Sequence, residues 1–152
     1  MRLTTVASHA LIACVASAAT FLVATDRFHI PSMAQAQAPG QRVIEVFKQE
    51  MADVSGRVLS VRLTERDPGN GSGPHRHPGS HTVGYILEGS YQVQIDNGPV
   101  RTLKAGEVFY EYPNALHAVS RNASSTAPLK YLIIQVSDPS KPGTVPEPEH
   151  PH

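Results

Sequence analysis

Residues 69–89 read GNGSGPHRHPGSHTVGYILEG and contain a loop, a closely spaced pair of histidines and a largely apolar segment. The loop already begins at Asp67, because glycine and proline at this density interrupt both strands and helices. It leads the chain to His75 and His77. The apolar segment, residues 81–88, then ends at a Gly-Ser turn, a pattern typical of a β-strand.

Similar short segments lie on both sides of this stretch. They are rich in apolar and β-branched residues, and turns containing glycine, proline or asparagine separate them. Residues 81–95 are expected to form a hairpin, because two such segments flank a two-residue turn. About eight strands at short, regular spacing predict an all-β sandwich or barrel rather than a parallel sheet with helices. The expected strands are 43–47, 58–63, 81–88, 91–95, 101–104, 107–112, 117–121 and 130–137.

His75 and His77 are two residues apart, so their side chains leave the same face of an extended segment. Two imidazole nitrogens can then reach one metal ion. The same spacing also occurs by chance, or as a pair of polar residues at a sheet edge. The pair alone leaves both interpretations open.

Two motifs in the chain resemble those of the cupin superfamily. Their conserved positions are occupied by Gly69, His75, His77 and Gly89 in the first motif and by Gly106 and His117 in the second. Asn114 stands where the family has glycine, and asparagine adopts a left-handed turn more readily than other non-glycine residues. Tyr112 stands at the family's proline position, with Pro113 directly after it. Asn122 lies one residue beyond the family's asparagine.

The resemblance covers roughly residues 58–136. It implies a cupin fold, that is, a double-stranded β-helix or jelly-roll barrel, which we place at residues 39–137. It also implies that His75, His77 and His117 hold one divalent metal ion.

The first motif lacks the glutamate of the family. Counting back from Gly89 puts Thr82 at that position, and threonine is a poor metal ligand. Counting forward from His77 puts His81 there, which would give a four-histidine site if the side chain turns inward. Because a slip of one residue sends a side chain to the opposite face of the sheet, His81 can equally face outward or lie beside the ligands.

Glu111 is the candidate catalytic residue. It occupies a position where the family usually has an apolar residue, and alternation places it on the same face as Phe109. On an inward face it could act as a general base, as a substitute ligand or as a partner that orients an imidazole. The alternative is an outward carboxylate paired with an arginine on a neighbouring strand.

Three neutral imidazoles suit zinc, iron, manganese, nickel or copper, and three protein ligands leave room for water or substrate. Some cupin dioxygenases resemble this arrangement, with iron held by three histidines. Two functions are therefore open: a metal-dependent, dioxygenase-like enzyme acting on a small molecule, or a non-catalytic cupin that binds or senses one. A homodimer is an option, since dimers are common among cupins.

The composition argues against several other classes of protein. Lys plus Arg and Asp plus Glu both number 13, so no uniform field attracts nucleic acid or an anionic membrane. The single cysteine, Cys14, lies in the apolar N-terminal run, which leaves no thiol or disulfide in the expected barrel. The chain also has no Gly-rich phosphate loop and no G-x-S-x-G motif.

Both ends of the chain are expected to lie outside the barrel. Residues 1–38 combine Arg2, the apolar run 11–24 and small residues around Ala36, which indicates a signal peptide or an uncleaved N-terminal anchor followed by a linker. The apolar run is short for a membrane span. The protein is therefore expected in the periplasm or secreted. Residues 138–152 hold five prolines and predict a disordered tail.

Overall fold

The computed structural model describes residues 39–148. The expected signal or anchor segment at 1–38 lies outside these residues, as do the last four residues of the tail. The part of the chain that is described consists of strands, turns and loops. It contains no helix long and apolar enough to cross a bilayer.

Eleven strands form within residues 39–148. Eight of them lie at the segments where short apolar and alternating stretches predicted strands; β3, β4 and β11 are additional pairs of residues. The strands are β1 (Gln41–Glu50), β2 (Val58–Arg66), β3 (Gly71–Ser72), β4 (His75–Arg76), β5 (Ser80–Glu88), β6 (Ser90–Ile95), β7 (Arg101–Lys104), β8 (Val108–Glu111), β9 (Leu116–Asn122), β10 (Leu129–Ser137) and β11 (Val145–Pro146).

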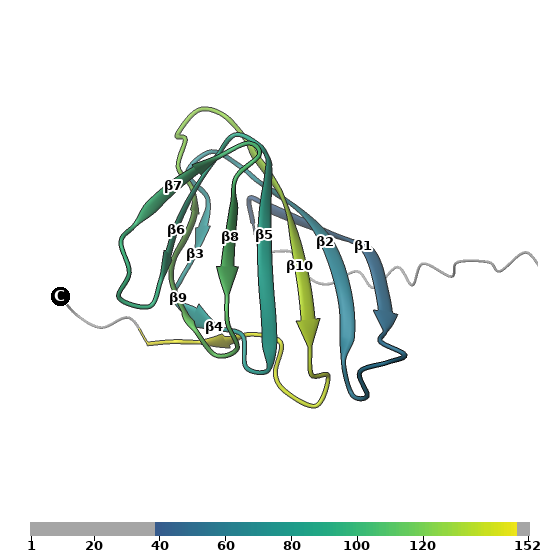
Figure 1. Cartoon of the computed structure of the whole chain (residues 1–152). Helices are drawn as coiled ribbons and strands as arrows, with labels where there is room; N and C mark the ends of the chain where they lie inside the picture. The colour runs from purple at the N-terminus through teal and green to yellow at the C-terminus, as the bar shows by residue number, and fades with distance from the viewer. Residues whose placement is uncertain (1–38, 149–152) are drawn as a thin grey trace, which may run out of the picture. The chain divides into compact units, whose positions relative to one another are not determined.

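The strands form two antiparallel sheets that face each other (Figure 1). The first sheet has the order β1-β2-β10-β5-β8, and the second has the order β11-β4-β9-β6-β7 with β3 also paired to β9. Strands far apart in the sequence are neighbours, as where β2 pairs with β10 from Val58↔Ser137 to Arg66↔Leu129. This is the arrangement of a double-stranded β-helix, so the predicted all-β jelly-roll fold is confirmed. The predicted hairpin over residues 81–95 is wrong, because β5 and β6 lie in different sheets and the turn between them carries the chain from one sheet to the other.

The hydrophobic core lies between the two sheets. Tyr91 stacks on Phe109 and on Tyr131, with ring centroids 5.1 and 5.0 Å apart respectively. Gly84 faces the Phe109 ring so closely that a Cβ atom there would lie 2.0 Å from Cε1 of the phenylalanine. The buried core residues are Ile86, Tyr91, Val93, Leu103, Phe109, Leu129 and Tyr131.

The turn before His117 uses the left-handed conformation expected of Asn114, whose φ angle is 66°. A bulkier or β-branched residue would be strained there, whereas asparagine tolerates this region. The substitution of asparagine for the family's glycine therefore preserves the turn that leads into β9.

Asn122, at the end of β9, holds neighbouring segments together. Its amide nitrogen donates to the carbonyl oxygens of Asp67 at 3.1 Å and Ala127 at 2.8 Å, and its amide oxygen accepts the Ser124 N–H at 2.9 Å. The side chain is only 2% exposed, so these hydrogen bonds replace its contacts with water.

The sequence predicts a disordered C-terminal tail, but the structure places its residues 138–148 in defined contacts with the barrel. Within them β11 pairs with β4, and the Glu147 carboxylate accepts two hydrogen bonds of 3.1 Å from Arg76. Figure 1 shows this segment running along the edge of the second sheet beside β4. Prolines do not prevent this, because a proline can end an edge strand where its missing N–H is not needed.

Candidate metal centre

Three histidines converge between the sheets. His75 lies in β4 and His117 in β9, where the two are direct cross-strand partners. His77 follows β4 two residues after His75. One ring nitrogen from each of the three lies within 4.8 Å of the others, a spacing at which a single ion can contact all of them.

Backbone carbonyls orient two of the imidazoles. Nδ1 of His75 lies 2.8 Å from the Gly73 carbonyl oxygen, and Nδ1 of His77 lies 2.6 Å from that of Gly143. Because a carbonyl oxygen only accepts, each Nδ1 carries the proton and each Nε2 keeps its lone pair. Metal-binding histidines are commonly held in this way.

Burial and the neighbouring imidazoles lower the pKa of His75, although its hydrogen bond to Gly73 acts in the opposite direction. Desolvation is the largest of these effects because it disfavours the charged ring. A neutral imidazole is the form that binds a metal ion.

His117 is 3% exposed and belongs to a buried polar chain. Its Nε2 lies 3.3 Å from the Tyr91 hydroxyl, which is 2.6 Å from the Ser120 hydroxyl. Burial raises the pKa of Tyr91 well above its usual value, so the phenol stays protonated and can donate.

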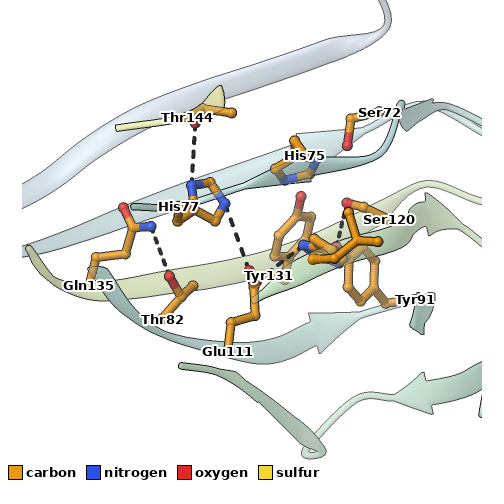
Figure 2. Close-up of polar contacts among 12 residues, drawn as sticks. Ser72, His75, His77, Thr82, Tyr91, Glu111, Ser120, Tyr131, Gln135 and Thr144 are labelled. Atoms are coloured by element: carbon orange, nitrogen blue, oxygen red, sulfur yellow. Dashed lines mark hydrogen bonds and ion pairs between the residues drawn. The ribbon is translucent and has the colours of Figure 1, made fainter. Parts of the chain in front are cut away.

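Glu111, at the end of β8, points inward and is 1% exposed. Its Oε1 lies 3.1 Å from Nδ1 of His117, and its Oε2 lies 3.9 Å from Nε2 of His77. Figure 2 shows the His77 ring between Thr144 on one side and Glu111 on the other.

Two buried atoms at this point lack hydrogen bonds. They are Oε2 of Glu111 and Nδ1 of His117, despite the short separation between the two side chains. Ligands about 2.0–2.2 Å from one ion lie roughly 3–3.5 Å from one another, and the 3.1 Å separation between Glu111 and His117 falls in this range. A buried carboxylate also requires a nearby positive charge. The three histidines therefore fit a divalent metal ion, and the buried Glu111 carboxylate lies beside two of them.

The structure does not bring His81 to this cluster. His81 is exposed on β5, and its Nδ1 lies 2.7 Å from the Tyr110 hydroxyl. The register of β5 turns the next residue inward instead: Thr82 is 1% exposed, and its hydroxyl accepts a 2.9 Å hydrogen bond from Gln135. Strand alternation thus excludes the four-histidine arrangement.

The cluster lines a cavity of about 380 Å³ between the sheets. Thr144 and Pro146 of the tail lie at this cavity, as do Arg62, Thr64 and Arg66 of β2. The sequence pattern alone did not place these β2 residues at the site. Their spacing of two residues was the available signal, but alternation alone does not tell an inward polar face from an outward one.

The Cupin domain family matches residues 62–135 of the chain. Among curated protein sequences, none matches this chain.

Solved structures with a similar fold differ widely from this chain in sequence. An uncharacterized conserved protein with a double-stranded β-helix domain from Klebsiella pneumoniae is 19% identical, with a TM-score of 0.53, over 73% of this chain and 87% of that one. The TT1209 protein from Thermus thermophilus is 27% identical, with a TM-score of 0.52, over 69% and 90%.

A recombinant oxalate oxidase in complex with glycolate is 24% identical, with a TM-score of 0.53, over 72% of this chain and 56% of that one. The family match covers both histidine motifs, and the described strands have the double-stranded β-helix arrangement of these structures. The chain belongs to the cupin superfamily.

Proposed function

We propose that this protein is an exported, metal-dependent cupin enzyme that acts on a small molecule within its barrel. The observation that carries the proposal is the group formed by His75, His77, His117 and Glu111. It combines three converging imidazoles with a buried carboxylate oxygen that has no hydrogen-bond partner, at the wall of a cavity.

Glu111 is the fourth ligand in this proposal. Its carboxylate supplies the negative charge that the family's missing glutamate would have contributed, and its separations from His77 and His117 suit shared coordination. When bound, the metal ion supplies Lewis acidity or a position for dioxygen at its remaining coordination sites.

The chain's own residues hold and enclose this centre. The carbonyl oxygens of Gly73 and Gly143 fix the ring orientation of His75 and His77. The Tyr91 hydroxyl, beside Nε2 of His117, holds a proton close to the centre. A cavity of about 380 Å³ lies at the small end of the range for ligand pockets, which suits a compact substrate.

Enzymatic use of this fold has a precedent in the similar oxalate oxidase, although fold alone does not name a reaction. The location in the periplasm or outside the cell follows from the N-terminal sequence, whose positive charge, apolar run and small residues suit an export signal.

The test uses the full chain. Elemental analysis of the purified protein should find about one transition-metal ion per chain, lost in His117→Ala and kept in the matched control His81→Ala. An oxygen electrode then follows dioxygen uptake by the iron-loaded protein with a panel of small organic acids and phenols. Uptake that stops in His117→Ala supports the enzyme, whereas a fully loaded protein that is inert towards every compound contradicts it and favours a binding role.

A further inference from the structure

Two arginines of β2 project into the same cavity as the histidines. Arg66 is 5% exposed, and its guanidinium donates to the Tyr131 hydroxyl at 2.9 Å and to the Ser120 carbonyl oxygen at 3.2 Å. Its remaining contacts, to the hydroxyls of Ser72 and Ser120, are long at 3.4 Å. Every one of these partners is neutral.

Arg62 is also incompletely satisfied. It donates to the Gln135 side-chain oxygen, but its buried Nε has no hydrogen-bond partner. Neither Arg62 nor Arg66 takes part in an ion pair among residues 39–148. Glu45, the cross-strand partner of Arg62 on β1, attracts its charge without forming an ion pair with it. Among the described residues, the two cationic side chains therefore line this cavity without an ion-paired carboxylate.

The charge balance of the cavity is positive. Its lining includes two guanidinium groups and one carboxylate, Glu111. A divalent metal ion would increase the excess further. Because a buried charge without a partner is costly, the cavity is electrostatically suited to an anion.

Hydrogen bonds connect Arg66 to the metal centre and connect Arg62 to a residue directly beside it. Arg66 contacts Ser120, whose hydroxyl bonds that of Tyr91 beside His117. Arg62 contacts Gln135, which donates to Thr82, the cross-strand neighbour of Glu111. The arginines and the histidines thus belong to one continuous polar lining that a single ligand can bridge.

We propose that the cavity binds a small organic carboxylate whose oxygens accept hydrogen bonds from Arg62 and Arg66 while its other end faces His75, His77 and His117. A guanidinium matches the planar geometry of a carboxylate and can offer it two parallel donors. The position of the ligand's reactive end rests on the proposed function; its anchoring by the arginines does not.

Malonate is the probe, and malonamide is its uncharged counterpart of nearly the same shape. Isothermal titration calorimetry measures the binding of each to the full chain, first freed of metal by a chelator and then loaded with one equivalent of zinc. We expect malonate to bind both forms, the zinc form more tightly. We expect malonamide to bind at least roughly tenfold more weakly, as for the loss of a charge-assisted hydrogen bond.

Substitutions test whether the two arginines bind malonate. Arg62→Gln should weaken malonate binding to the metal-free chain by roughly tenfold. Arg66→Lys, which keeps the charge but loses the fork of donors, should weaken it as well. The control is Arg42→Gln, whose side chain is 63% exposed beside Glu65 and should leave binding unchanged.

The outcomes separate the two proposals. Malonate binding that depends on Arg62 in a chain unable to hold zinc would support the anion site and refute the metal centre. Three results would overturn the carboxylate proposal: no malonate binding, equal binding of malonate and malonamide, or malonate binding that is unaffected in Arg62→Gln and Arg66→Lys. If the same chain still binds zinc, the metal centre stays in place.

Discussion

Thr82 of β5 and Glu111 of β8 are direct cross-strand partners, and both side chains are 1% exposed. Thr82 stands at the position where the first cupin motif has its glutamate when that motif is aligned on Gly89. The carboxylate of this chain therefore lies one strand away from the family's position but on the same inward face. Directly opposed residues have Cβ atoms about 4.5–5.5 Å apart, a distance that a glutamate side chain readily spans.

Replacing Glu111 with glutamine should weaken metal binding while keeping the shape of the side chain. The loss of a negatively charged ligand or close partner is expected to lower zinc affinity by roughly 10- to 100-fold. Competition with a chromophoric chelator measures this affinity. Glu88→Gln, on an exposed part of β5, is the matched control, and equal affinities in the two variants would show that Glu111 does not support the metal.

Exchanging Thr82 and Glu111 tests whether a carboxylate on β5 can replace the one on β8 in supporting the metal. Glu111→Thr alone should lose zinc affinity, and the double variant Thr82→Glu with Glu111→Thr should recover most of it, because the carboxylate then returns through the neighbouring strand. The two changes are in contact and are expected to be non-additive. A double variant as weak as Glu111→Thr would argue that only the β8 position can reach the ion.

The tail strand β11 should loosen when its ion pair is broken. Arg76 and Glu147 form a partly exposed bidentate pair, and solvent screening keeps the contribution of such pairs to stability small. Arg76→Gln should therefore speed local opening by up to about fivefold. Hydrogen exchange at the Glu147 amide, which donates to the Pro74 carbonyl oxygen at 2.9 Å, measures it. Unchanged exchange relative to the exposed control Arg101→Gln would show that other contacts hold the strand.

Asn122→Ala should destabilise the whole fold. The substitution leaves the carbonyls of Asp67 and Ala127 and the Ser124 N–H without their partner, and the expected loss is about 3 kcal/mol of unfolding free energy. Urea denaturation measures the loss, with the exposed turn variant Asn97→Ala as a comparison that should change little. Similar midpoints for the two variants would contradict this assignment.

The Asp96 carboxylate should make the free energy of unfolding decrease at acidic pH. The Tyr112 hydroxyl and then the Leu116 N–H donate to its carboxylate and lower its pKa, so the folded state favours the ionised form. This contribution is complete above the unfolded pKa, about 3.9, and is lost as the pH falls through the lower folded value. Melting temperatures of wild type and Asp96→Asn should therefore differ at pH 7 and converge near pH 2. A constant difference would exclude the linkage.

Much of the fold could be predicted because strand signals are local. Segments such as 101–104 and 130–137 carry apolar or β-branched residues between turns, and the structure has β7 and β10 there. The two-residue strands β4 and β11 carry no such pattern. Their pairing depends on contacts such as Arg76 with Glu147, which are distant in sequence and which no periodicity reveals.

Site residues could be predicted where their spacing in the sequence determines which way the side chains point. They could not be predicted where the pairing register of the strand determines it. His75 and His77 share a face because they are two residues apart. Whether His81 or Thr82 points inward depends on the β5 register, which the adjacent strands fix. The inward direction of Glu111 follows that of Phe109, two residues earlier, but only the structure shows that Phe109 belongs to the core.

The central claim is that His75, His77 and His117 together hold one divalent ion. X-ray absorption spectroscopy of the full chain loaded with one equivalent of zinc measures the ligands of that ion directly. If the three histidines hold the ion, the spectrum should show scattering from about three imidazoles at roughly 2.0–2.1 Å with additional oxygen, and His117→Ala should clearly lose imidazole scattering. A spectrum without imidazole scattering, or one that His117→Ala leaves unchanged, would contradict this claim.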